Sequence, residues 1–363
     1  MRITHIITTI ELGGAEKQLY ILAKSQFEHG HDVEIYFLKG KPELKQALEY
    51  SGVRVCEELV NRNPLIQIFL LRRKIRRDSD FIYHAHLPRS ELMLAMAGGS
   101  QFKTVASKHN AEPFFPKAPK FLSRTLSRFS ASRTQVIIAI SESVRQFVYN
   151  SREVPPARSV SVTHYGYSPE SETNHGRVAT FLKEFKLEGE TVVIGTISRL
   201  ERQKDLGTLL LAFKIFHSRV NNSKLLIVGA GSLRDELELL ALELEISDSV
   251  IWVGRITEVQ EFLHLLDVFV LTSLYEGFGL VLLEAMVAGL PIVASNISAI
   301  PEVLGKDHPG LCEVRNPEDF ADKMFQSVNL DRSEVLKTNK ARLSLFSPES
   351  SFREIENLYN SLE

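Results

Sequence analysis

The chain has almost no cysteine and no long uninterrupted apolar run. Cys56 and Cys312 are the only two cysteines among 363 residues, and they lie far apart. So few thiols give no sign of a disulfide framework or a thiolate metal site, and they fit a reducing cytoplasm. The longest weakly charged stretch, 277–301, is long enough to cross a bilayer. A glutamate, a glycine and a proline divide it, so we expect a helix, a stop and a strand there.

The net charge of −2 conceals a division between the two halves. Residues 1–168 hold 24 Lys and Arg against 15 Asp and Glu, a net charge of +9, and the remainder carries −11. The composition is otherwise that of a folded globular protein, with 44% hydrophobic and 24% charged residues. A basic half beside an acidic half indicates that the first half meets something anionic.

Short apolar segments alternate with helical patterns along both halves, and the length exceeds what one hydrophobic core usually supports. Strands separated by helices predict parallel sheets covered on both faces. We expect an α/β protein of two doubly wound domains, 1–168 and 169–346, facing across a cleft, with Ser168–Glu190 as the linker. The expected strands are Arg2–Ile10, Val33–Leu38, Phe81–His86, Thr104–Ser107, Val136–Ile140, Val192–Ser198, Lys224–Val228, Ile251–Val253, Val268–Leu271 and Pro291–Ala294.

The segment from Glu276 to Met286 carries the sharpest chemical signal. Beyond Gly279 it is apolar almost all round a helix, so we expect a buried helix with one charge, Glu284, about one turn in. A buried carboxylate needs hydrogen-bond donors, either ribose hydroxyls or backbone amides of a neighbouring loop. Gly277 and Gly279 let the backbone approach a ligand, and the helix start suits a diphosphate. Glu276, in the loop, would then face a sugar.

Two cations follow a strand of the second half. Arg199 and Lys204 come between that strand and a helix that starts near Asp205. Cations at the carboxyl end of a strand can hold a diphosphate leaving group, although arginines and lysines in loops are most often merely solvated. The glycine-rich turns 13–14 and 229–231 lack the spacing of a P-loop or a dinucleotide fingerprint, which disfavours a nicotinamide enzyme.

Three histidines, His84, His86 and His109, stand at the ends of neighbouring strand patterns. Strand ends are where catalytic groups of open α/β sheets gather. We expect a structural role for His84 and a functional one for His109. The three rings have the chemistry of zinc ligands, but their spacing matches no standard arrangement. The acidic triplet Asp78-Ser79-Asp80 precedes its strand and is interpreted as a surface turn.

Taken together, these segments resemble the retaining glycosyltransferases of family 4, which have the GT-B fold. The resemblance covers nearly the whole chain, and its most specific mark is the pair Glu276 and Glu284 with seven residues between them. The other matching segments are 13–16, 84–86, 108–110, Ser141-Glu142-Ser143, Tyr165-Gly166, Arg199 with Lys204, 228–231 and Pro301-Glu302-Val303. The resemblance implies two Rossmann-like domains and a last helix, 347–363, that crosses back to the first.

The family also implies a role for each matching residue. Its catalytic set would be His109, near the transferred sugar, with Glu276, Arg199 and Lys204. Its donor-binding set would be Gly14 at the donor–acceptor junction, Arg199 and Lys204 at the phosphates, Glu276 at the sugar hydroxyls, Gly277 with the backbone of Phe278, Gly279 and Leu280 at the diphosphate, and Glu284 at the ribose. Backbone around 254–257 would meet the base. The family implies no metal, no cofactor and retention without a protein nucleophile. One departure is Asp205, where the family has glycine; it could cap the next helix.

The segment from Phe114 to Arg133 interleaves aromatic and basic residues. Its charges at Lys117, Lys120, Arg124 and Arg128 lie among apolar residues, and 72–77 form a second basic run. A basic amphipathic helix can lie on an anionic bilayer. We therefore expect a cytoplasmic protein whose first domain docks on the cytoplasmic leaflet, where a lipid-linked acceptor would wait. The alternative is a solvated helix whose apolar side faces the core.

The leading expectation is a metal-independent enzyme that transfers a sugar from a UDP-linked donor to a lipid-linked or polysaccharide acceptor in cell-surface glycan biosynthesis. A sugar-nucleotide epimerase of the same fold is the first alternative, but no motif nominates its acid and base. A nucleic-acid-binding protein is the second. It would carry basic and aromatic residues on an open sheet face or a recognition helix, whereas these strands are expected to be buried.

Overall fold

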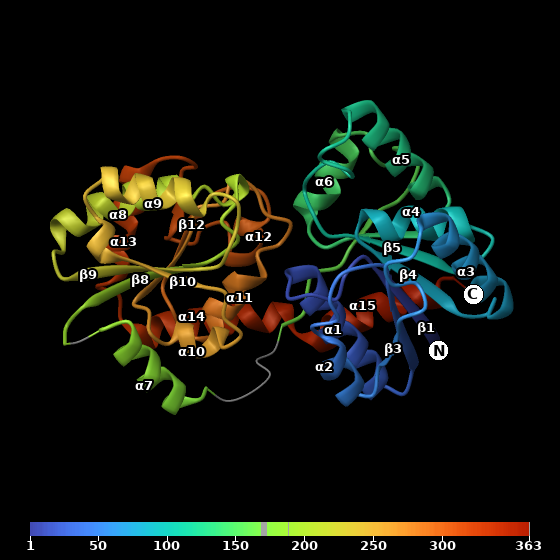
Figure 1. The fold of residues 1–363 in the computed structure, drawn as a ribbon, viewed down its shortest axis with the longest axis horizontal. Coiled ribbons are helices and arrows are strands. Elements are labelled where there is room, and N and C mark those ends of the chain that lie inside the picture. Colours follow the sequence, from blue (N-terminus) through green and yellow to red (C-terminus); the bar gives the residue numbers. More distant parts are fainter. Residues whose placement is uncertain (168–172, 188, 363) are drawn as a thin grey trace. The chain divides into compact units, whose positions relative to one another are not determined.

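The chain folds into two compact units, each built on a parallel sheet with helices on both faces (Figure 1). The computed structural model describes residues 1–167, 173–187 and 189–362. Unit 1 comprises Met1–Tyr167 and Phe346–Glu363, and unit 2 comprises Ser168–Leu345. The doubly wound α/β class expected from the sequence is confirmed in both units, because apolar strands buried on both faces pair in parallel and leave the helices outside.

The sheet of unit 1 has the strand order β3-β2-β1-β4-β5-β6-β7. Its strands are β1 (Arg2–Ile7), β2 (Asp32–Phe37), β3 (Arg54–Cys56), β4 (Ile82–His86), β5 (Thr104–Lys108), β6 (Val136–Ala139) and β7 (Ser161–Val162). The chain winds one way from β1 to β3 and the other way from β4 onward. The reversal between β1 and β4 is the topological switch point, where open α/β sheets bind ligands.

Two layers of helices cover this sheet. The helices of unit 1 are α1 (Gly14–Glu28), α2 (Lys45–Tyr50), α3 (Pro64–Arg77), α4 (Pro88–Ala97), α5 (Lys120–Ser132), α6 (Glu142–Asn150) and α15 (Pro348–Asn360). On one face α4 packs between α3 and α5. On the other, α15 packs beside α1, and its Ile355 and Tyr359 join the core that Ile3 and Ile82 form. The C-terminal helix therefore belongs to unit 1.

Unit 2 repeats the plan with the strand order β10-β9-β8-β11-β12-β13 and its switch point between β8 and β11. Its strands are β8 (Val192–Ile197), β9 (Ser223–Val228), β10 (Val250–Gly254), β11 (Val268–Leu271), β12 (Ile292–Ser295) and β13 (Leu311–Cys312). Its helices are α7 (His175–Glu184), α8 (Leu206–Arg219), α9 (Arg234–Glu243), α10 (Val259–Leu263), α11 (Leu280–Val287), α12 (Ile300–Leu304), α13 (Pro317–Ser327) and α14 (Arg332–Leu343). No helix in the described part of the chain is long and apolar enough to cross a membrane.

Four elements were not anticipated from the sequence. Strands β3, β7 and β13 were not predicted, because each is a short edge strand of two or three residues with too little apolar pattern. The expected linker Ser168–Glu190 contains helix α7, whose start is capped by Asn174 and whose Phe181 is buried. Residues 168–172 and 188 of that linker lie outside the described residues.

Candidate functional site

The predicted cations and carboxylate of unit 2 meet at its switch point. Strands β8 and β11 are hydrogen-bonded neighbours, so the loops that follow them emerge at the same sheet edge. Lys204 Nζ lies 2.5 Å from Glu276 Oε1, and Ser273 Oγ donates to the same oxygen at 2.6 Å. The side chains of Lys204 and Glu276 are only 13% and 9% exposed. The structure thus places a largely buried ion pair where the sequence predicted two separate ligand contacts.

A glutamine that the sequence did not single out joins these two loops. Gln203 Nε2 donates to the Tyr275 carbonyl at 2.9 Å, and Gln203 Oε1 accepts from Arg199 at 2.8 Å. Backbone contacts reinforce the link, since Leu274 N donates to the Gln203 carbonyl and Thr272 Oγ1 to that of Lys204, both at 2.8 Å. Gln203 therefore orients Arg199 relative to the loop that carries Glu276. The only sequence signal was a polar residue between two cations.

The glycines after β9 make room for the loop that carries Arg199. A Cβ at Gly229 would lie 1.8 Å from the Ser198 carbonyl oxygen, and one at Gly231 would lie 2.3 Å from that of Leu200. Leu200 N also donates to the Ala230 carbonyl at 3.1 Å. The turn 229–231 holds the backbone on either side of Arg199, which explains these glycines without a dinucleotide fingerprint.

Helix α11 begins at Leu280, directly after Gly279 as the sequence predicted, and is buried. Gly279 adopts φ 86° and ψ 55°, a left-handed conformation that glycine takes without strain. No side chain caps the helix start, so the backbone N–H groups of its first turn have no capping side chain as a partner. Glu284 is 6% exposed and lies among buried apolar neighbours on α11. This is the charged group inside an apolar helix that the pattern indicated.

Asp205, the departure from the family, behaves differently from the expected cap. It precedes α8 in the left-handed region, with φ 46° and ψ 48°, and its carboxylate accepts no backbone N–H of the helix. The carboxylate accepts instead from the Thr208 hydroxyl at 2.8 Å. The left-handed conformation is the one that glycine would adopt most readily, so the backbone keeps its shape while the residue changes.

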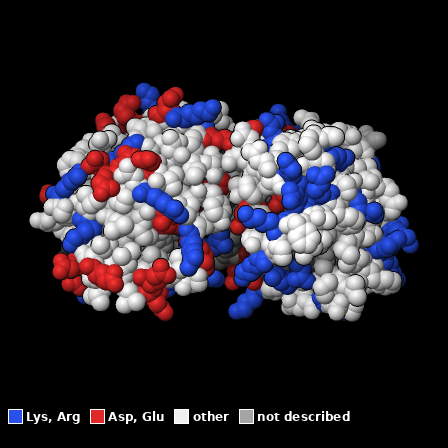
Figure 2. Space-filling view, turned by 90° about the horizontal axis from the view of Figure 1, so that it is seen from above, with Lys and Arg blue, Asp and Glu red and all other residues white. Residues whose placement is uncertain are grey.

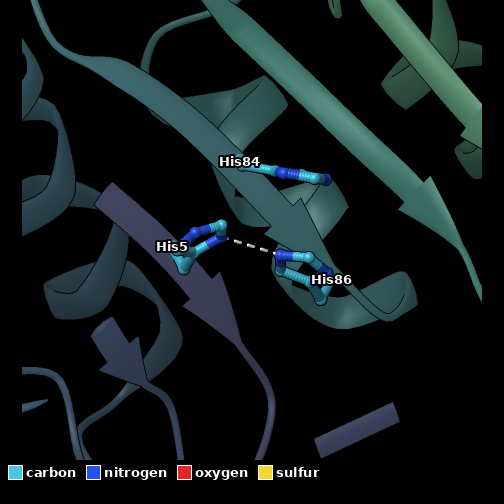
Figure 3. A group of neighbouring side chains, drawn as sticks. All are labelled: His5, His84 and His86. Carbon is cyan, nitrogen blue, oxygen red and sulfur yellow. Dashed lines mark hydrogen bonds between the residues drawn. The ribbon is translucent and has the colours of Figure 1, made fainter. Parts of the chain in front are cut away.

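In unit 1 the predicted histidines converge on the switch point, together with one that was missed. His109 Nε2 lies 3.1 Å from His86 Nδ1, and His109 Nδ1 bonds the Tyr165 hydroxyl. Burial lowers the pKa of His109 to about 3. Ligand atoms of His5, His84 and His86 lie within 4.8 Å of one another (Figure 3). The group with this spacing includes His5, which the sequence analysis did not single out, in place of His109. His5 escaped notice because it sits inside an apolar strand.

Gly14 opens α1 just beyond β1, at the same edge of the sheet. Gly13 precedes the helix in an extended conformation, and no side chain caps the first turn. A Cβ at Gly14 would meet no atom within 4 Å, whereas one at Gly13 would lie 2.4 Å from Oε2 of Glu16, an acidic residue in the first turn. The helix start therefore already has a carboxylate beside it, and the role of Gly14 at the donor stays a prediction.

Helix α5 turns its small polar residues toward the core and its large apolar residues toward solvent. Its buried residues are Ser123, Ser127, Ser130 and Ala131, whereas Phe121 is 67% exposed and Leu122 40%. The charges at Lys117, Lys120 and Arg128 are exposed and Arg124 is half-buried. Figure 2 shows Lys and Arg gathered over unit 1, on the right. The alternative in which the apolar side faces the core is wrong for Phe121 and Leu122.

Two family models and several relatives match this chain. A model described as "Glycosyltransferase Family 4" matches residues 12–170, and one described as "Glycosyl transferases group 1" matches 179–342. N-acetyl-alpha-D-glucosaminyl L-malate synthase of Bacillus anthracis is 27% identical over 90% of this chain and 87% of its own length. A GDP-mannose-dependent alpha-(1-6)-phosphatidylinositol monomannoside mannosyltransferase of Mycobacterium tuberculosis is 25% identical, over 84% and 81%.

The fold is shared with solved structures. Anabaena Alr3699/HepE, crystallised in complex with UDP-glucose, superposes with a TM-score of 0.82 at 18% identity, over 99% of this chain and 100% of that one. TarM superposes with a TM-score of 0.77 at 16% identity, over 99% and 98%. At these identities the comparison concerns the fold alone, and it agrees with the two Rossmann-like sheets described above.

Proposed function

Because this chain belongs to the family 4 glycosyltransferases with the GT-B fold, we propose that it moves a sugar from a UDP-linked donor to a lipid-linked or polysaccharide acceptor, with retention and without a metal. The observation that carries the proposal is the contact of Lys204 with Glu276 at the switch point of unit 2. It sets a cation for phosphate beside a carboxylate for sugar hydroxyls, next to the uncapped start of α11.

Each group has a chemical task in this proposal. Arg199, Lys204 and the N–H groups at the start of α11 stabilise the charge that grows on the diphosphate as its bond to the sugar breaks. Glu276 accepts from sugar hydroxyls, and Glu284 from the ribose hydroxyls. The acceptor hydroxyl attacks on the face that the diphosphate leaves, and its proton passes to the leaving phosphate oxygen. This sequence needs neither a protein nucleophile nor a metal.

The first property to determine is the nucleotide base of the donor. The Anabaena structure contains UDP-glucose, whereas the Mycobacterium relative is named for GDP-mannose. We expect transfer or slow hydrolysis from one UDP-sugar in a radiolabelled panel of UDP- and GDP-sugars, unchanged by EDTA. Activity with GDP-sugars alone would overturn the UDP assignment, and loss of activity on chelation would overturn metal independence. A product that remains a nucleotide sugar would indicate epimerisation instead.

We further propose that the layer of α3, α4 and α5 rests on an anionic bilayer that presents the acceptor. The reversed polarity of α5 supports this, because its phenylalanines are exposed while its serines are buried. On α3 the residues Leu65, Ile66 and Phe69 are exposed beside four exposed arginines, and neither helix contains an acidic residue. Each cation near an anionic surface contributes about 1 kcal/mol. Apolar side chains supply the part that salt does not screen.

Vesicle flotation tests the membrane contact. We expect unit 1 to carry the protein to phosphatidylglycerol vesicles but not to phosphatidylcholine vesicles. Binding should fall when Lys117, Lys120 and Arg124 become Gln, and should become fully salt-sensitive when Phe121 and Leu122 become Ser. The matched control changes three exposed lysines of unit 2, Lys183, Lys337 and Lys340, to Gln. Equal binding by the two triple variants would refute the docking surface.

A further inference from the structure

A continuous chain of hydrogen bonds runs through the core of unit 1, and we call its eight side chains the imidazole chain. It begins where the Tyr165 hydroxyl bonds His109 Nδ1. The contacts that follow are His109 Nε2 to His86 Nδ1 at 3.1 Å, His86 Nε2 to His5 Nδ1 at 2.9 Å, His5 Nε2 to Gln26 Oε1 at 2.8 Å, Gln26 Nε2 to Tyr359 Oη at 3.4 Å, Tyr359 Oη to His84 Nδ1 at 2.6 Å and His84 Nε2 to Ser107 Oγ at 2.7 Å.

All four imidazoles of the chain are neutral at physiological pH. Burial lowers the pKa of His5 to about 4 and that of His109 to about 3, and it holds the pKa values of His84 and His86 well below the ordinary range. A neutral imidazole has one N–H donor and one lone pair. Both nitrogens of every ring are bonded in the chain, so each ring must donate on one side and accept on the other. The whole chain must then run in one direction.

The orientation of one amide decides that direction. Gln26 turns Oε1 toward His5 and Nε2 toward Tyr359, so His5 donates from Nε2. His5 Nδ1 then accepts from His86 Nε2, and His86 Nδ1 accepts from His109 Nε2. A flipped amide would move every ring proton to Nδ1. Gln26 is 1% exposed and is held between α1 and the core, so it acts as the polarity-setting group.

The two tyrosines favour the same direction. Tyr165 and Tyr359 each face an Nδ1 atom, of His109 and His84 respectively. Burial raises the pKa of both phenols, which therefore keep their protons. A phenol O–H is a stronger donor than an imidazole N–H, and an imidazole lone pair is a better acceptor than a phenol oxygen. Protons on Nε2 give each tyrosine the partner that it bonds best.

The same cluster is a poor metal site. The rings of His84 and His86 stack with centroids 4.1 Å apart and 30° between their planes. A ligating nitrogen directs its lone pair within its ring plane, so two stacked rings do not aim at one ion. Both nitrogens of His84 also bond Tyr359 and Ser107. The convergence of His5, His84 and His86 is thus accounted for by hydrogen bonding.

We propose that the imidazole chain holds His109 as a neutral ring with its proton on Nε2, and that Gln26 and Tyr359 are the positioning residues that set this state. The consequence for catalysis rests on the proposed function. A ring fixed in this form has a single acceptor atom, Nδ1, and a substrate hydroxyl would reach it only by displacing the Tyr165 hydroxyl that bonds it in the structure. Tyr359 belongs to α15, so the C-terminal helix helps to set the tautomer of His109, although the helix lies far from His109 in the sequence.

Nitrogen-15 spectra of the histidines test the tautomers without any substrate. We expect the long-range proton–nitrogen pattern of His5, His84, His86 and His109 to show neutral rings protonated on Nε2 at pH 7. Rings protonated on Nδ1, or a mixture of both forms, would overturn the proposal. A change in these four signals on adding Zn²⁺ alone would also overturn it, in favour of a metal site.

Kinetics of Gln26→Leu test the positioning role. We expect kcat to fall about 10-fold while KM for the donor stays unchanged, as for residues that orient an active group through another. The control is Gln67→Leu, since Gln67 is also fully buried in unit 1 and bonds the carbonyls of Leu38 and Leu59. It should lose stability and keep the tautomers and kcat.

A second variant tests the same role in case Gln26→Leu does not fold. Tyr359→Phe keeps the ring that packs in the core and removes the hydroxyl between Gln26 and His84. We expect it to mix the tautomers and to lower kcat. Wild-type kcat in a variant whose tautomers are mixed would overturn the positioning role. If the wild-type protein transfers no sugar, the proposed function fails, whereas the spectra still decide the polarity of the chain.

Discussion

The two units share one architecture and place opposite kinds of polar group at its switch point. Unit 2 places a largely buried Lys204–Glu276 ion pair there, beside an uncapped helix start. Unit 1 places buried, neutral imidazoles there, and both nitrogens of each ring are hydrogen-bonded. The strand reversal determines where polar side chains gather. The partner then determines the charge, because an opposite charge stabilises the ion pair of unit 2, whereas burial among neutral groups leaves the imidazoles of unit 1 uncharged.

The largest effect that would separate the units is expected from Lys204→Ala. Removing the cation deprives the departing diphosphate of its charge partner and leaves Glu276 with Ser273. We expect kcat for sugar transfer to fall by about 10²- to 10³-fold. The control is Lys214→Ala on α8, a half-exposed lysine whose ion partner Glu245 lies 4.0 Å away. Wild-type kcat in Lys204→Ala would show that unit 2 does not hold the leaving group.

A comparison of two buried glutamates, one in each unit, comes next. Glu284→Ala should weaken donor binding by about 10- to 100-fold in calorimetry, since hydrogen bonds to a charged group are lost. Glu91 of unit 1 is paired with Lys108 at 2.5 Å and has a structural role. Glu91→Ala should destabilise the fold by about 3–5 kcal/mol, because it leaves a buried lysine unpaired. It should leave the affinity for the donor unchanged. Unchanged donor affinity in Glu284→Ala would refute the ribose role.

Acidification should separate the stabilities of the units. The folded pKa values of His5 and His109, about 4 and 3, lie below the ordinary value of 6.5. Below pH 6.5 the unfolded chain therefore binds protons that folded unit 1 does not. Its stability should fall from pH 6.5 toward pH 4, by up to about 1.4 kcal/mol per pH unit for each such ring, and stay constant above pH 7. In unit 2 burial lowers the pKa of His308 to about 4, and it also lowers the pKa of His217.

Two optical probes can follow this difference. Trp252 on β10 is the single tryptophan of the chain, so its fluorescence reports the melting of unit 2, whereas circular dichroism reports both units. Between pH 7 and pH 5 we expect the dichroism transition to move to lower temperature by more than the fluorescence transition. Equal shifts would mean that the buried imidazoles do not make unit 1 lose more stability in acid than unit 2.

The smallest effect is expected from Asp205→Gly. Glycine relieves the left-handed strain, worth about 1 kcal/mol, but it loses the bond with Thr208 and makes the unfolded chain more flexible. We expect a change in unfolding free energy below about 1 kcal/mol and unaltered donor affinity by calorimetry. A clear gain in donor affinity would show that the aspartate alters the loop that carries Arg199 and Lys204.

Local patterns alone were enough for much of unit 2. The apolar run after Gly279 predicted helix α11, and its single charge marked Glu284 before any contact was known. The spacing of Arg199 and Lys204 after β8 predicted cations at a strand end. These inferences succeed because each depends on residues within one or two turns of each other. The imidazole chain could not be predicted that way. His5 and His86 are 81 residues apart, and Tyr359 reaches His84 across 275.

The sequence by itself determined the two-unit α/β fold, the buried helix and the division of charge, because periodicity and composition are local properties. The tertiary structure alone decided which polar groups share a site, through strand order and register. It paired Lys204 with Glu276, placed Gln203 between their loops and turned the apolar side of α5 outward. It also decided which histidines lose their charge, because that depends on burial by distant segments, including a helix from the far end of the chain.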